Sequence, residues 1–369
     1  MDAPTRNAHA RLRRSAVNIK TRSVPTIIDV AERAGVSIKT VSRVLNNEAN
    51  VRADTREAVL EVVRQFNYRP KQSARSLAGA RSYLIGLLYY DPSAAYIGGV
   101  QRGATLACRE SGYHLVVESL GQEAPDIEEQ LDRMLAALRP DGLILTPPLC
   151  DDPRVLSAVN ATRTPCVLIS PGAGQTMAHV LMDDVRAAEE LGNLLISLGH
   201  ERIGFIEGAP DQAASARRRQ GFEQALHAHG LKLDETLVHR GDFTFPSGVE
   251  AAHKMLSTRR PPSAVFASND DMALGVLAAA QRLGIQVPQD LSIVGFDDSP
   301  AASLVWPALT TVRQPVGAMA AAAVEMLVRG EVLPAGAAGA LAEAPFRVVQ
   351  HELVVRASTA ARPRPTRRK

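Results

Sequence analysis

The sequence predicts a small all-α domain followed by a larger α/β body built as two lobes with parallel sheets. Three observations lead to this prediction. The 369 residues, 46% of them hydrophobic, are too many for one ordinary domain and too apolar for a disordered chain. Three short amphipathic helices fit within residues 24–70. From residue 84 onward, short apolar strands alternate with helices, which is typical of parallel sheets covered on both faces.

Charge is distributed unevenly between these parts. Residues 1–82 hold 16 Lys and Arg against 7 Asp and Glu, whereas residues 83–352 hold 20 against 32, and the last 17 residues add six basic residues and no acid. Phosphate attracts a basic head and repels an acidic body, so this pattern fits a nucleic-acid-binding protein with a separate sensing domain. A basic disordered arm without a partner gives the same pattern, and charge alone leaves both interpretations open.

The three predicted helices of the head have identifiable ends. Thr26 is a candidate N-cap for a first helix that ends near Gly35, and Ser37 is a candidate N-cap for a second. A third helix opens at Asp54 and Thr55 and stops before proline 70. The apolar residues of each helix recur on one face: Ile27, Val30, Ala31 and Ala34; Val41, Val44 and Leu45; Val59, Val63 and Phe66.

Two short helices joined by a glycine-containing turn, with a third to close the core, form the helix-turn-helix plan, which places the second helix in the major groove of DNA. The face of the second helix opposite its apolar stripe is polar and cationic, as this role requires. An ordinary three-helix bundle needs the same stripes, because amphipathicity reports only burial.

Several short runs carry a more specific signal. They are residues 26–31 (TIIDVA), 34–37 (AGVS), 40–46 (TVSRVLN), 67–70 (NYRP) and 74–78 (ARSLA). Together they closely resemble the head of the LacI/GalR (lactose/galactose repressor) family of bacterial transcriptional regulators, and the resemblance extends over residues 24–359. It implies a DNA-binding headpiece at 24–70, a hinge helix or linker at 71–82, and a ligand-binding and dimerisation domain at 83–359 of the type I periplasmic-binding-protein-like fold. Basic, disordered tails are expected at 1–23 and 360–369.

The resemblance also implies roles for residues of the head. Ile38, Lys39 and Arg43 are expected to face base edges; Arg43 can donate two hydrogen bonds to guanine, whereas Ile38 can only touch a thymine methyl. Short polar side chains are expected on phosphates, which fixes register without carrying sequence information. They are Thr26, Thr40, Ser42, Asn46 and Thr55. For Thr26, simple helix capping is an equally good explanation.

The hinge segment is expected to contact the minor groove through Ala74 and Leu77. In the family this segment folds into a short helix on DNA, and the leucine wedges between base steps. Unstacking a step costs about a few kcal/mol, which the added contacts offset. A helix this short does not persist alone in water, so it is a natural point at which a ligand can disrupt DNA binding.

In the body, two series of apolar strands predict two lobes. The first series is residues 85–89, 113–117, 143–145 and 167–169, and the second is residues 203–206, 265–267 and 293–296. Sheets of this kind bind ligands outside the carboxyl ends of their strands, here in the crevice between the lobes. Polar residues that follow these strands are therefore candidates for ligand contact.

By resemblance, Arg218, Asn269, Asp297 and Gln314 match effector-contact positions, and Phe243 lies where an aromatic ring packs on the ligand. Tyr96 is a further candidate at the mouth of the crevice. Structural explanations stay open: a helix cap for Asn269, a core ring for Phe243, and for Arg218 a surface charge like its neighbours Arg217 and Arg219. Ser170 falls where some sugar-binding relatives carry an acid, so their hydroxyl-binding pattern cannot be transferred whole.

Other chemistries find little support. Glycines 172 and 174 begin a dinucleotide-binding fingerprint but lack its third glycine, and neither a Walker loop nor a nucleophile elbow is present. The nine histidines and three cysteines have no metal-ligand spacing, and the cysteines are expected to be reduced core thiols. We therefore expect no enzymatic activity, no cofactor and no metal.

The sequence thus predicts a cytoplasmic, ligand-controlled regulator of transcription, a repressor that binds palindromic double-stranded operator DNA as a homodimer. A carbohydrate is the expected effector, and no membrane association is expected. Prolines near the C-terminus argue against the leucine heptad of tetrameric relatives. Two alternatives remain: a solute-binding protein with the same body and no regulatory role, and a regulator that depends on a purine-type corepressor. The sequence leaves open the identity of the effector, induction versus corepression, the operator and the role of residues 1–23.

Overall fold

A computed structural model describes residues 25–45, 48–68, 81–90, 93–121, 126–332 and 344–362. The chain divides into two compact units, Met1–Ala80 and Arg81–Lys369, called the head and the body below. The predicted roles of Asn46, Ala74 and Leu77 fall outside the described residues, as does the predicted tail at 1–23. Within the described part of the chain, no helix has both the length and the apolar character needed to cross a bilayer.

The head consists of three helices, α1 (Ile27–Ala34), α2 (Ile38–Leu45) and α3 (Ala53–Gln65). Thr26 caps α1 in a capping box with Asp29, and Gly35 ends it in the left-handed region with φ of 64°. Ser37 Oγ accepts a hydrogen bond from the Thr40 amide at 3.1 Å and so caps α2. These two helices match their predicted ends, whereas α3 begins one residue earlier than predicted and ends at Gln65.

The core of the head is formed by the predicted apolar stripes. Val30, Val41 and Val59 are completely buried, one from each helix, and Val44 is nearly so. Val62 of α3 is also buried, whereas Val63 and Phe66, which the periodicity favoured, are only partly buried against the cluster. Burying this stripe of α2 leaves its other face for solvent or a partner.

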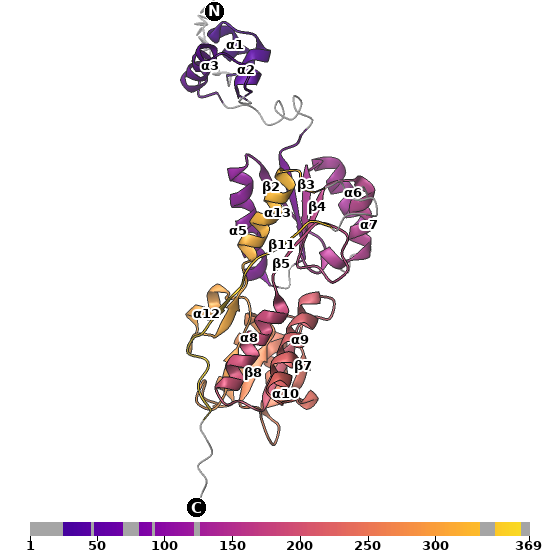
Figure 1. Ribbon diagram of the computed structural model, residues 1–369, viewed down its shortest axis with the longest axis vertical. Coiled ribbons are helices and arrows are strands. Elements are labelled where there is room, and N and C mark those ends of the chain that lie inside the picture. Colours follow the sequence, from indigo (N-terminus) through magenta and orange to yellow (C-terminus); the bar gives the residue numbers. More distant parts are fainter. Residues whose placement is uncertain are drawn as a thin grey trace, which may run out of the picture. The chain divides into compact units, whose positions relative to one another are not determined.

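The body contains two parallel sheets, one in each lobe (Figure 1). The strand order is β11-β5-β4-β3-β1-β2 in the first lobe and β7-β6-β8-β9 in the second. The first lobe comprises β1 (Leu84–Tyr89), α5 (Ala94–Glu110), β2 (His114–Ser119), α6 (Ile127–Leu138), β3 (Gly142–Leu145), α7 (Pro153–Thr162), β4 (Cys166–Ile169), β5 (His179–Leu181), α13 (Val316–Val328) and β11 (Phe346–Val348). The second comprises α8 (Asp184–Ser197), β6 (Ile203–Glu207), α9 (Ala213–Ala228), β7 (Val238–Arg240), α10 (Phe245–Leu256), β8 (Ala264–Ala267), α11 (Asp270–Arg282), β9 (Ser292–Val294) and α12 (Pro300–Leu304).

Four strands of three residues each were not predicted: β5, β7, β11 and β12 (Glu352–Val354). The last pairs antiparallel with β10 (Thr311–Arg313), which lies within the run 309–313 that the sequence places before Gln314. Strands this short do not show a period that a sequence pattern can reveal. The predicted strand at 293–296 ends at Val294. The two-lobe, mainly parallel architecture is nevertheless the one predicted.

The chain passes between the lobes three times, after β5, after β10 and after β11. Two of these crossings carry polar residues that matter for the site, Asp184 at the start of α8 and Gln314 just after β10. Helices α8 and α9 pack closely at Gly221, where an added Cβ atom would lie 2.0 Å from the Val185 carbonyl oxygen. Only glycine allows that approach, three residues after Arg218.

Candidate functional site

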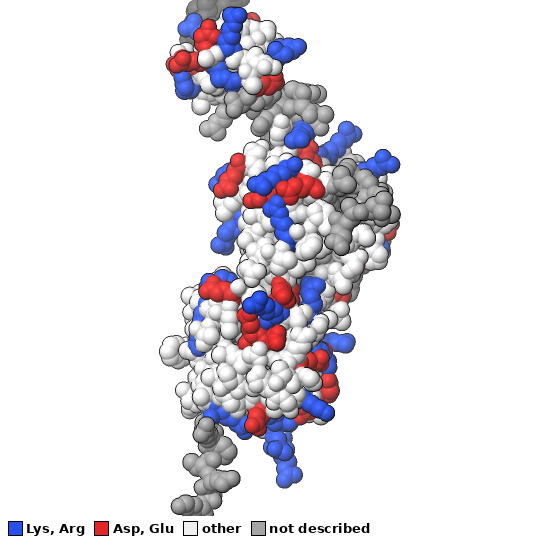
Figure 2. All heavy atoms as spheres, in the orientation of Figure 1, with Lys and Arg blue, Asp and Glu red and all other residues white. Residues whose placement is uncertain are grey.

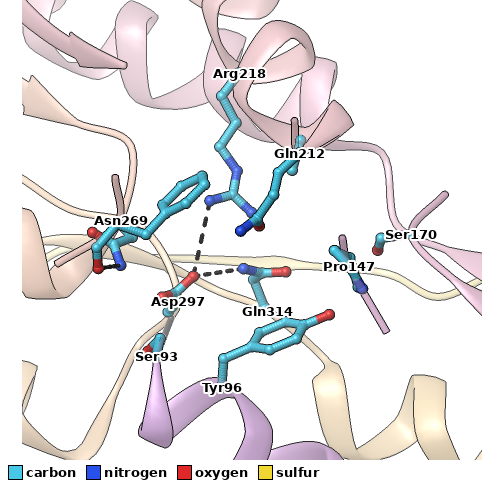
Figure 3. A pocket seen from close by; sticks show the side chains of 11 residues that line it. Ser93, Tyr96, Pro147, Ser170, Gln212, Arg218, Asn269, Asp297 and Gln314 are labelled. Atoms are coloured by element: carbon cyan, nitrogen blue, oxygen red, sulfur yellow. Dashed lines mark hydrogen bonds and ion pairs between the residues drawn. The ribbon is translucent and has the colours of Figure 1, made fainter. Parts of the chain in front are cut away.

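A cavity between the two lobes is lined by side chains from both (Figure 3). It holds about 500 Å³ of space that no atom fills, its open mouth included. The structure brings into this lining all seven residues that the sequence nominated for ligand contact: Tyr96, Ser170, Arg218, Phe243, Asn269, Asp297 and Gln314. Residues more than 200 positions apart in the chain therefore meet at one place.

Arg218 lies at the centre of the hydrogen-bonding network of the cavity. Its side chain is 5% exposed; Nε donates to Asp184 Oδ1 at 3.0 Å and Nη1 donates to the Ser268 carbonyl at 2.6 Å. The guanidinium carbon lies 3.8 Å from the centre of the Phe296 ring, within cation-π range. No described residue accepts a hydrogen bond from Nη2. The guanidinium is thus fixed on one side and retains donor capacity toward the cavity.

Asp297 faces Arg218 across the cavity, with Oδ1 4.0 Å from Nη1 (Figure 3). Gln314 donates a hydrogen bond from Nε2 to the same carboxylate oxygen. Burial raises the pKa of the Asp297 carboxyl, while Arg218 and the Gln314 amide act in the opposite direction. This carboxyl group is therefore poorly hydrated, and its oxygens are available for hydrogen bonds with a ligand.

Asn269 and Phe243 are held together. Asn269 is the N-cap of α11, accepting from the Met272 amide, and its Nδ2 donates to the Phe243 carbonyl at 2.9 Å. Asn269 therefore does cap α11, and its side chain still has one N–H donor and one oxygen lone pair without a partner among the described residues. The Phe243 ring packs where Gly208 leaves space, since a Cβ at that glycine would lie 1.9 Å from the ring.

Three residues of the lining have a backbone that side chains rarely adopt. Ser170 has φ of 49°, Phe243 of 67° and Asp297 of 128°. Non-glycine residues in this region are strained, and such strain is concentrated at ligand sites. The surrounding contacts must hold these three residues in place.

Tyr96 and Ser170 complete the predicted set from the first lobe. Burial raises the pKa of the Tyr96 phenol, which therefore stays protonated and can donate. Ser170 follows β4, and its carbonyl accepts from Arg217 of the second lobe at 3.2 Å. Arg217, which sequence reasoning treated as a surface charge, also donates to the Pro171 carbonyl and so links the lobes.

The sequence missed four residues of the lining: Ser93, Pro147, Gln212 and Ala214. Ser93 and Gln212 are the residues that precede α5 and α9. A polar residue between a strand and the next helix was the signal that could have identified both, as it did for Asn269. Ser93 has a second contact of interest, because its Oγ donates to Asp271 in the other lobe.

Asp270, next to Asn269, lies beneath the cavity and does not line it. It is completely buried and accepts hydrogen bonds from the Thr311 hydroxyl and the Ser299 amide, both at 2.7 Å. Burial raises the pKa of the Asp270 carboxyl. Its contacts tie α11 to the segments on either side of α12.

The part of the chain that the structure describes contains no cluster of His, Cys, Asp or Glu arranged to hold a metal ion. The three cysteines are free and buried, as expected. Burial raises the pKa of the Cys108 thiol to about 11. A thiol of that kind is unreactive at neutral pH.

In the head, the predicted base-contacting residues lie on one exposed face of α2. Ile38 is 48% exposed, and Lys39 and Arg43 are exposed beside it. The residues predicted to contact phosphate are partly engaged already: Thr26 in its capping box, Thr40 with Ser37 Oγ, and Thr55 with Asp54 Oδ1. Ser42 is half-buried. Backbone amides and hydroxyls at helix starts can still turn to an incoming anion.

Known proteins resemble this chain in both units. Residues 26–71 match the family described as bacterial regulatory proteins, lacI family, and residues 193–359 match the periplasmic binding protein-like domain. The HTH-type transcriptional regulator DegA of Bacillus subtilis is 36% identical over 80% of this chain and 88% of its own length. The HTH-type transcriptional regulator GalS of Salmonella typhimurium is 36% identical over 83% and 89%.

Solved structures agree with these matches. The transcriptional regulator CelR in complex with cellobiose has a TM-score of 0.67 and 32% identity, covering 90% of this chain and 99% of its own. The lac repressor dimer bound to operator and the anti-inducer ONPF has a TM-score of 0.75 and 28% identity, covering 92% and 100%.

Proposed function

The chain belongs to the LacI family of bacterial regulatory proteins and is a DNA-binding transcriptional regulator; on this premise we propose that it is a repressor controlled by a small carbohydrate held between the lobes. The observation that supports the ligand class is the meeting of Arg218, Asn269 and Asp297 with the Phe243 ring in one cavity. No catalytic role is part of the proposal, and the proposed location is the cytoplasm.

A carbohydrate suits this lining for a chemical reason. Each sugar hydroxyl both donates and accepts, and neighbouring hydroxyls are bound best by side chains that offer two adjacent atoms, as Asp297, Asn269 and Arg218 do. The apolar face of a sugar ring can pack on Phe243. The similar structure of CelR with cellobiose supports the same class.

The proposed DNA contacts lie on the head. Ile38, Lys39 and Arg43 are proposed to face the bases, with Thr26, Thr40, Ser42, Asn46 and Thr55 on phosphates. Thr26, Ile38, Lys39 and Arg43 are exposed, which supports these members of the set, whereas Thr40, Ser42 and Thr55 are half-buried. The proposed minor-groove contacts of Ala74 and Leu77 rest on the family resemblance alone.

A homodimer is proposed because a two-fold operator requires two heads. The body offers an apolar surface for a second copy, since Leu304 and Trp306 are 83% and 84% exposed. Large apolar side chains so fully exposed are typical of interaction sites. In Figure 2 an uncharged area lies in the middle of the visible face of the second lobe, the lower one, with charges of both signs around it.

The proposed mechanism is a change in the angle between the lobes on ligand binding, which alters how far apart the two DNA-binding segments of a dimer are held. Two polar links join the lobes beside the cavity, Ser93 to Asp271 and Arg217 to Ser170. A ligand that strengthens or replaces these links favours one lobe angle over the other.

The test uses the purified full-length protein. A thermal-shift screen over monosaccharides, disaccharides, purine bases and nucleosides is expected to give its largest shift with a sugar. Fluorescence anisotropy with genomic duplexes is expected to show salt-dependent, sequence-selective binding that the same sugar changes. A shift with purines alone would replace the carbohydrate assignment, and equal binding to all duplexes would overturn the regulatory one.

A further inference from the structure

We propose that Glu48 determines sequence specificity in the head by holding the Arg43 guanidinium in the orientation that donates to guanine. This inference rests on the proposed base-contacting role of Arg43. It adds a residue for which neither the sequence pattern nor the family resemblance gave any role.

The carboxylate of Glu48 lies on one particular edge of the Arg43 side chain. Its Oε2 is 3.5 Å from Nε of Arg43. The edge formed by the two terminal nitrogens, Nη1 and Nη2, has no hydrogen-bond partner among the residues that the structure describes. A guanidinium has five N–H donors in a rigid planar fork. Pairing through Nε therefore leaves the terminal edge free.

The backbone of Glu48 is anchored on both sides. Its amide donates to the Arg43 carbonyl at 3.0 Å, which ties it to the last turn of α2. Its carbonyl accepts from Nη2 of Arg56 in α3. The carboxylate thus projects from an anchored backbone near the base of the Arg43 side chain.

The free edge of Arg43 matches what guanine presents. O6 and N7 of guanine are two neighbouring acceptors in the major groove, and they accept two parallel N–H bonds from one arginine. A long side chain without a second contact has many rotamers to give up on binding. A carboxylate on the Nε side restricts those rotamers before the DNA arrives.

Binding to DNA reduces the solvent screening of the ion pair between Arg43 and Glu48. The Arg43 and Glu48 side chains are 44% and 49% exposed, so their ion pair contributes little to the stability of the free head. When a duplex covers this face, water is displaced and the same pair interacts more strongly. Phosphates repel the carboxylate on any duplex, and only a sequence that gives Arg43 its guanine compensates for that repulsion. Attraction to the right base and repulsion from all others together produce selectivity.

Other described acids of the head do not have this arrangement. Asp29 is bound in the capping box of α1. Glu61 pairs with Arg64 on the same helix at 2.6 Å, with exposed fractions of 52% and 66%. Glu61→Gln removes the same charge and a comparable surface pair, and therefore serves as a matched control for Glu48→Gln.

The experiment uses the full-length protein and a random duplex library. Selection with the wild type gives the preferred sequence, and selection with Arg43→Ala identifies the base pair that Arg43 contacts. Anisotropy titrations at fixed salt then compare the preferred duplex with versions changed at that pair or at a distant pair. For wild type we expect on the order of tenfold preference for G·C at the Arg43 position.

In Glu48→Gln, the preference for G·C at the Arg43 position is expected to fall to about twofold, while discrimination at the distant pair is kept. Affinity for random duplexes is expected to rise a few-fold, because the carboxylate that phosphates repel is gone. Glu61→Gln should keep the wild-type preference, and circular dichroism should show all variants folded. Unchanged preference in Glu48→Gln, or an equal loss at every pair, would overturn the proposal. If wild type selects no sequence, the proposed function itself fails, and if Arg43→Ala changes no single pair, Arg43 is not the base-contacting residue.

Discussion

Ser93 Oγ donates a hydrogen bond of 3.0 Å to Asp271 Oδ2, and this bond joins the start of α5 in one lobe to the first turn of α11 in the other. On another side of the cavity, Arg217 of α9 donates to the carbonyls of Ser170 and Pro171. Because Ser93 and Ser170 both line the cavity, each link borders the proposed ligand. Closure of the lobes and occupation of the cavity therefore involve the same groups.

Replacing Ser93 with alanine should weaken the closed arrangement of the lobes. The variant loses one hydrogen bond to a carboxylate, worth about 1 to 2 kcal/mol, so effector affinity should fall roughly five- to thirtyfold. Isothermal titration with the sugar found in the screen measures this loss. Ser197→Ala removes a hydroxyl that bonds only its own helix, at the Leu194 carbonyl, and should bind as wild type does. Equal affinities for wild type and Ser93→Ala would show that the link has no part in binding.

Arg218→Lys should strongly weaken effector binding while the protein stays folded. Lysine keeps the positive charge between Asp184 and Asp297 but lacks the planar fork that reaches Ser268, Asp184 and the ligand together. We expect affinity to fall at least tenfold, or about 1.4 kcal/mol. Calorimetry and a thermal melt measure binding and folding. The exposed Arg186, which pairs with Glu190, provides the control: Arg186→Lys should bind the effector as wild type does. Effector binding by Arg218→Lys as tight as that of wild type would exclude the proposed contact between Arg218 and the ligand.

Asp297→Asn should change how stability depends on pH. Burial raises the pKa of Asp297 in the folded protein, so the folded state binds this proton more tightly than the unfolded chain does. Its stabilising contribution is present below the ordinary carboxyl pKa and is lost as the pH rises through the raised value. The Asn variant should therefore gain stability relative to wild type between about pH 4 and about pH 8.

Thermal or urea unfolding without effector measures this gain. Glu250 offers a contrast, because its hydrogen bond with Lys254 lowers its pKa and Glu250→Gln should not show the same gain over that range. Parallel pH curves for wild type and Asp297→Asn would mean that the Asp297 carboxyl titrates normally.

Trp306→Asp should weaken the homodimer. A charge at a side chain that is 84% exposed in the single chain is harmless to the fold but opposes burial against a second copy. Sedimentation velocity should show the dimer dissociating at concentrations at least tenfold higher than for wild type. Leu283→Asp, at an apolar side chain 43% exposed after α11, is the control. A tetramer for wild type would contradict the predicted assembly, and an unaffected dimer would place the interface elsewhere.

Local physical chemistry explains how much the sequence could predict. The ends of α1 and α2 followed from Thr26, Gly35 and Ser37, because capping depends on neighbours within four residues. Asn269 and Asp297 were found because the carboxyl ends of parallel strands share one edge of a sheet. The strands β5, β7, β11 and β12 were missed because they have only three residues each and are stabilised by partners distant in sequence, as β11 is by β5.

The sequence by itself determined the helical head, the two-lobed body, the family and seven of the eleven residues that line the cavity, since each depends on short-range pattern or on a match of motifs. Only the tertiary structure decided which charges face one another. Arg217 links two lobes rather than lying free at the surface, Ser93 reaches Asp271 across 178 positions, and Glu48 lies on one edge of Arg43. Electrostatic and hydrogen-bond energies depend on distances of a few ångströms and on burial, and these quantities exist only once the chain has folded.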